Sequence, residues 1–95
     1  MSVRGFQTLA RRLGVPVVVG SLTTRGFYSA STKPEDLTGK DYAPELVGSP
    51  SVLLETVEGL GVDDPLTVDG KAWVVRYPLQ ESDGAVTRYF LAEAP

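Results

Sequence analysis

The sequence predicts a small, mainly β protein, an antiparallel β-sandwich or barrel of about six to seven strands with a short N-terminal helix and a long mobile loop. Two patterns carry this prediction. Apolar residues recur every three to four positions over residues 1–14, which is the period of a helix lying on a surface. From Val15 onward apolar and polar residues alternate, and Gly and Pro separate the runs, as in strands joined by turns. We therefore expect a helical arm at residues 1–14 and one β domain at residues 15–95.

The N-terminal segment is predicted to be amphipathic. Its apolar positions are Val3, Phe6, Leu9 or Ala10, and Leu13. Gly14 is a residue type at which helices commonly end. A helix this short is only marginally stable alone, so it has to pack against something. Two interpretations stay open: the helix covers one side of the sheet, or it is an arm that orders only on a partner.

The alternating pattern predicts the strands. They are expected at Val15–Gly20, Leu22–Tyr28, Ser51–Val57, the run around Leu66 and Val68, Lys71–Leu79 and Ala85–Ala92. Asp69-Gly70 is a two-residue hairpin signal, and Ser82-Asp83-Gly84 marks the next turn. The last three strands therefore form a meander. Its core is predicted to contain Val68, Trp73, Val75, Tyr89 and Leu91, with Trp73, Val75, Tyr77 and Leu79 on one face of their strand.

Residues 29–48 form the longest segment without a regular pattern. The segment contains two Pro, two Gly and six charged residues. Long loops of this kind are usually functional or disordered, so we expect it to be mobile in the isolated chain and to contact partners. The candidate partner-contact residues are Lys33, Glu35, Asp36, Lys40, Asp41, Tyr42 and Glu45 of the loop, with Phe6, Arg11 and Arg12 of the arm.

The composition argues against an enzyme. The absence of Cys excludes a thiol nucleophile and a zinc–thiolate site, and the absence of His excludes a Ser–His–acid triad. No remaining group stands in a recognisable catalytic arrangement, so we expect no catalytic residue, no metal and no cofactor.

Three short motifs do not indicate the binding sites that they resemble, and the second and third are better explained as turns. Thr38-Gly39-Lys40 lacks the first glycine of a phosphate-binding loop, and Gly59-Leu60-Gly61 is too short for a dinucleotide fingerprint. Asp63-Asp64 lacks the spaced oxygen ligands of a calcium loop. The aromatic residues Trp73, Tyr77 and Tyr89 suit either a core cluster or a platform for a sugar or base.

The charge distribution is uneven. The net charge is −3, which argues against a nucleic-acid binder. Residues 1–14 nevertheless carry three Arg and no acid, whereas residues 15–95 carry six basic residues and all twelve acids. No run of apolar residues approaches the length of about 20 needed to cross a bilayer, and no signal peptide is expected.

The order of several segments resembles the head–tail joining proteins of lambda-like phages. The resemblance covers about Val15–Ala92. The matching segments are Arg25-Gly26-Phe27-Tyr28, Gly48-Ser49-Pro50-Ser51-Val52-Leu53-Leu54, Asp64-Pro65-Leu66-Thr67-Val68-Asp69-Gly70, Trp73-Val74-Val75-Arg76 and the Asp83-Gly84 turn.

The resemblance implies a fold related to tail-tube subunits and a structural role in a phage or prophage virion. The chain would be a monomer when isolated and would assemble as a ring, expected to be hexameric, that joins the DNA-filled head to the tail. Its partners would be a head-completion or portal-side protein and a tail terminator or tail-tube protein, without a membrane or specific nucleic-acid binding. It would reside in the virion, and in the host cytoplasm during assembly. The alternatives are a tail terminator or tail-tube-like subunit, and a small ligand-binding β module.

Overall fold

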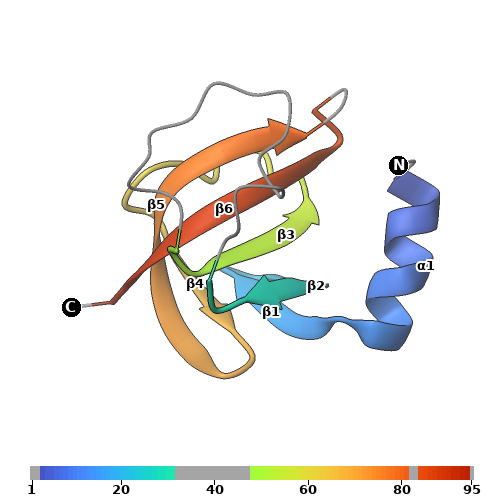
Figure 1. Ribbon diagram of the computed structural model, residues 1–95, viewed down its shortest axis with the longest axis horizontal. Coiled ribbons are helices and arrows are strands. Elements are labelled where there is room, and N and C mark those ends of the chain that lie inside the picture. The colour runs from blue at the N-terminus through green and yellow to red at the C-terminus, as the bar shows by residue number, and fades with distance from the viewer. Residues whose placement is uncertain (1–2, 32–47, 82–83, 95) are drawn as a thin grey trace.

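Six antiparallel strands form a closed barrel, and one helix lies against its outer surface (Figure 1). The computed structural model describes residues 3–31, 48–81 and 84–94, and all structural statements concern these residues. The elements are α1 (Val3–Leu13), β1 (Val15–Val19), β2 (Leu22–Ser29), β3 (Ser51–Glu55), β4 (Pro65–Val68), β5 (Lys71–Glu81) and β6 (Val86–Glu93). The predicted mainly β fold with a short N-terminal helix is thus confirmed, and the barrel replaces the sandwich alternative.

The order of strands around the barrel is β1-β2-β3-β6-β5-β4. The predicted meander is present as β4, β5 and β6. Its first turn is the expected hairpin, since Asp69 and Gly70 both have positive φ angles between the paired residues Val68 and Lys71. The barrel closes where β1 pairs with β4, through Val17 opposite Val68 and a hydrogen bond from the Asp69 amide to the Pro16 carbonyl.

The interior of the barrel is filled by side chains from β1, β3, β4, β5 and β6. The buried cluster consists of Val17, Val52, Leu54, Leu66, Val68, Trp73, Val75, Tyr89 and Leu91. All five residues predicted to be buried together belong to it, and Trp73 is only 6% exposed. A six-stranded barrel is narrow enough for side chains to fill it, so the centre is a packed core and not a channel.

The predicted single face of β5 is wrong beyond Val75. The register shifts between Val75, which faces Leu91, and Tyr77, which faces Phe90. Arg76 is therefore the extra residue of a β-bulge, and it reverses the orientation of the residues that follow. Tyr77 points away from the core and is 43% exposed, and Leu79 lies opposite Arg88 on the same outer face.

Helix α1 packs on the outside of β2 and β3. Phe6 and Ala10 are buried against Phe27, Leu53 and Val86, so the helix covers one side of the sheet, as one of the two interpretations expected. Phe6 meets the edge of the Phe27 ring at a centroid distance of 5.4 Å. The expectation for Leu13 is wrong, because Leu13 is 73% exposed.

The remaining sequence predictions concern the connections. Asp63-Asp64 lies in a turn, where the Asp64 carboxylate accepts a hydrogen bond from the Gly61 amide at 2.8 Å. Gly59 also lies in a turn and has a positive φ angle. Most of the predicted 29–48 loop, including Thr38-Gly39-Lys40, lies outside the described residues, as do Ser82 and Asp83.

The core predicts a large difference between two aromatic residues of β5. Trp73→Ala should lower the free energy of unfolding by about 3–5 kcal/mol, because it leaves a cavity among buried side chains. Tyr77→Ala should cost only about 1 kcal/mol, since its ring lies beyond the bulge on the outer face. Urea unfolding followed by circular dichroism measures both. Equal losses for the two variants would contradict the observed register.

Candidate functional site

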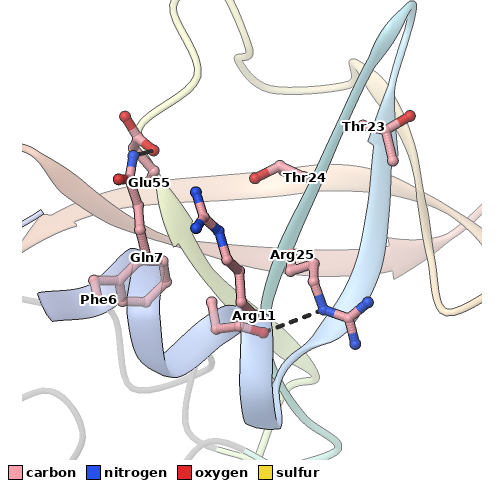
Figure 2. A pocket seen from close by; sticks show the side chains of 8 residues that line it. Phe6, Gln7, Arg11, Thr23, Thr24, Arg25 and Glu55 are labelled. Atoms are coloured by element: carbon pink, nitrogen blue, oxygen red, sulfur yellow. Dashed lines mark hydrogen bonds between the residues drawn. The ribbon is translucent and has the colours of Figure 1, made fainter. Parts of the chain in front are cut away.

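A polar groove runs between α1 and the β1–β2 hairpin, and its volume is about 300 Å³. Figure 2 shows that α1 forms one wall and β2 the other, with Glu55 at the end of β3 closing the groove. Its lining residues are Phe6, Gln7, Ala10, Arg11, Thr23, Thr24, Arg25 and Glu55. Apart from Phe6 and Ala10, which anchor the helix, all of these side chains are polar or charged.

Gly14 determines how closely the helix end approaches the barrel. A Cβ atom on Gly14 would lie 2.7 Å from the carbonyl oxygens of both Ala10 and Gly26. The chain therefore passes from α1 into β1 with its backbone directly against β2. Gly26 allows a different contact, because its Cβ atom would lie 2.6 Å from the Leu53 carbonyl oxygen and would collide with the Leu54 side chain of β3.

Arg25 joins the C-terminal end of α1 to β2. Its Nε donates a hydrogen bond to the Ala10 carbonyl at 3.2 Å, and its Nη2 donates one to the Gly14 carbonyl at 2.6 Å. The Ala10 carbonyl also accepts a hydrogen bond from the Gly14 amide at 2.9 Å, so Arg25 adds a second donor at Ala10 and supplies one at Gly14. The Arg25 side chain thus links the last turn of α1 to β2.

The charges in the groove are only partly compensated. Gln7 Nε2 donates a hydrogen bond to Glu55 Oε2 at 2.7 Å. Arg11 extends its guanidinium group into the groove, toward the space between Glu55 and Thr24 (Figure 2). Within the described residues Arg11 forms no ion pair. The groove therefore contains two arginines and one glutamate, with the Arg11 charge available to a ligand.

The three candidate contact residues of the arm occupy different environments. Phe6 is buried beneath α1, whereas Arg11 and Arg12 are exposed on the last turn. Of these, Phe6 and Arg11 line the groove, and Arg12 does not. The seven loop candidates, Lys33, Glu35, Asp36, Lys40, Asp41, Tyr42 and Glu45, lie outside the described residues.

Sequence reasoning missed five polar groove residues: Gln7, Thr23, Thr24, Arg25 and Glu55. They come from α1, β2 and β3, and nothing in their spacing along the chain shows that these elements meet. Arg25 did carry a signal, because it precedes Gly26, the one glycine inside a predicted strand. A glycine in a strand often marks a close approach of another backbone.

The aromatic platform considered from the sequence is not formed. Trp73 and Tyr89 belong to the barrel core, whereas Tyr77 lies on the outer face, where its ring is 6.4 Å from that of Phe90. The half-exposed neighbour of Trp73 is instead Tyr28, at a centroid distance of 6.1 Å. The Lys71 ammonium group lies 4.4 Å from the centre of a Trp73 ring and also pairs with Glu93. These contacts bring groups of the barrel wall together, and the cavity beside them measures only about 210 Å³.

The part of the chain that the structure describes contains neither a cluster of metal-binding side chains nor a helix that could span a membrane. No three acidic side chains there lie close enough together to hold a metal ion. The single helix of that part is too short to span a membrane. A comparison with protein-family models finds no match, and a comparison with curated protein sequences finds no significant relative.

The role of Arg25 can be tested by hydrogen exchange. Arg25→Met should reduce the protection of the amides in the second half of α1 by about 1–2 kcal/mol, because two charge-assisted hydrogen bonds are lost. Amides of β5 and β6 should keep their protection. Arg12→Met is the matched control, since Arg12 is an exposed arginine on the last turn of α1 that does not make these bonds. Unchanged exchange in α1 of the Arg25 variant would show that Arg25 does not hold the helix.

Proposed function

We propose that this protein is a structural component of a phage or prophage virion that joins the DNA-filled head to the tail as a ring of copies. The order of its segments, which resembles the head–tail joining proteins of lambda-like phages, is one line of support. The observation that carries the proposal is the outer face of α1. A tail terminator or tail-tube-like subunit is the alternative within the same class, and it differs in its partner.

Two leucines are exposed on the outer face of α1, among polar and charged neighbours. Leu9 is 43% exposed and Leu13 is 73% exposed, although both lie on a helix that is otherwise anchored by Phe6 and Ala10. Exposed leucines on a docked helix cost solvation free energy that burial in an assembly would recover, at about 25 cal/mol for each Å² removed from water. This supports α1 as a contact surface.

Charge favours another copy of the same chain as the occupant of that surface. Residues 1–14 carry three Arg and no acid, while residues 15–95 carry twelve acids against six basic residues. The helix of one copy and the body of the next are therefore complementary in sign. Such a contact joins two different surfaces, and repeated contacts of this kind close into a ring when the rotation allows it.

The first test concerns Leu13. Purified protein is mixed with separately prepared heads and tails, and infectious particles are counted. Leu13→Gln should reduce their number at least about tenfold, because truncation of an interface anchor commonly costs more than 1 kcal/mol. The control is Val62→Gln, which makes a similar change at a 58% exposed residue of a turn. Both variants should stay folded. Normal yields from Leu13→Gln would contradict a role for α1 in joining.

A second test concerns the loop. Deletion of Lys33–Asp41 should leave the sheet folded, as judged by circular dichroism, since Leu37 is its only apolar residue. Joining should nevertheless fail and leave filled heads beside free tails in electron micrographs. Mixed charges suit pairing with complementary neighbours, which is the reason to expect this loss. Full infectivity with the shortened loop would contradict a role for the loop and would indicate that the arm makes the essential contacts.

A further inference from the structure

We propose that the groove between α1 and the β1–β2 hairpin binds an acidic peptide segment of a partner protein, whose carboxylate pairs with Arg11. This inference concerns the isolated chain, and it stands whether or not the chain joins heads to tails. It rests on a division of roles between the arginines around the groove, on the Gln7–Glu55 pair and on the size of the space.

The first step is that Arg11 has no structural role among the described residues. Arg25 already donates hydrogen bonds to two carbonyl groups at this end of the helix, those of Ala10 and Gly14. Arg12 supplies a second positive charge to the same helix end without entering the groove. Arg11 is therefore not needed to satisfy or neutralise the C-terminal end of the helix, and its guanidinium group is directed into the groove (Figure 2).

The second step is that the groove offers donors and an acceptor together. The Arg11 guanidinium can bind both oxygens of a carboxylate, and the half-buried Thr24 hydroxyl lies beside it (Figure 2). Glu55, held by Gln7 at 2.7 Å, presents a negative charge at the closed end. Glu55 repels a doubly charged phosphate group more strongly than it repels a single carboxylate. A peptide offers both kinds of group. Its backbone N–H groups can donate hydrogen bonds to Glu55, and its side-chain carboxylate can pair with Arg11.

The third step is size. Sites for small molecules and cofactors usually measure about 300–1,000 Å³ and are mostly apolar. This groove, at about 300 Å³, is at the lower limit, and its accessible side chains are polar. It accommodates a side chain with its adjoining backbone better than a cofactor. An acidic segment of a protein is the ligand that matches its volume and its charges.

The experiment is a titration of the ¹⁵N-labelled full chain with a short peptide of alternating Gly and Glu, acetylated and amidated so that only its side chains are charged. The backbone amide resonances of Gln7, Thr24 and Glu55 are expected to show chemical-shift changes that saturate. Arg11→Gln should weaken binding at least about tenfold, because a charge-assisted hydrogen bond contributes about 1.5–3 kcal/mol. Arg12→Gln changes the net charge by the same amount on the same turn. Its affinity for the peptide should stay within about twofold of that of the unchanged protein.

Three further arms make the outcome decisive. A peptide with Gln in place of Glu should not bind, and Arg11→Lys should bind with intermediate strength, because lysine keeps the charge without the two-pronged geometry. Orthophosphate and an oligothymidylate should bind more weakly than the acidic peptide. Equal weakening by Arg11→Gln and Arg12→Gln, stronger binding of the oligothymidylate, or no shifts at peptide concentrations on the order of 10 mM would each overturn the proposal.

Discussion

The pairing of β1 with β4 is the contact on which the rest of the structure depends. Five of the six strand pairs join β1 to β2, β2 to β3, β3 to β6, β6 to β5 and β5 to β4, and they alone would form an open sheet. The sixth pair, with Val17 opposite Val68, closes that sheet. Closure encloses the apolar side chains of β1, β3, β4, β5 and β6 and removes the unpaired edges that would otherwise pair with other chains. A chain without disulfides can form a core in this way at a length of 95 residues.

A filled barrel leaves binding to its outer surface. The interior is occupied by the chain's own side chains, so ligands have to meet the walls, the ends or the helix. On the outside, Gly14 allows the end of α1 to lie directly against β2, and two hydrogen bonds from Arg25 hold it there. Leu13 is exposed beside this contact, and a polar groove lies along Arg11.

The arginines of this region show how one residue type takes different roles. Arg25 binds backbone carbonyl groups and is structural. Arg11 and Arg12 are adjacent in sequence, yet only Arg11 lines the groove, because neighbouring helical residues point about 100° apart. The proposed assembly surface, centred on Leu9 and Leu13, and the proposed peptide groove share α1 and use different side chains of it. The absence of a matching family leaves these surfaces and the resemblance in segment order as the basis for function.

Local patterns in the sequence were sufficient for the helix, the strands and the core of the meander. Alternation places Val68, Trp73, Val75, Tyr89 and Leu91 on inward faces, and Asp69-Gly70 specifies its hairpin, because both signals act between residues close in the chain. They failed at β5, where the bulge at Arg76 reverses Tyr77 and Leu79. Pro78 was the available sign, since a proline within a central strand usually accompanies a bulge.

What only the tertiary structure decided depends on contacts between residues distant in the chain. The pairing of β1 with β4, which makes a barrel and not a sandwich, joins residues about fifty positions apart and leaves no mark in either strand's local pattern. The groove likewise combines Gln7, Thr24 and Glu55 from three elements. Composition and periodicity determine which side of each element is apolar. Which apolar sides meet, and which polar groups are thereby brought together, follows only from the packing of the whole chain.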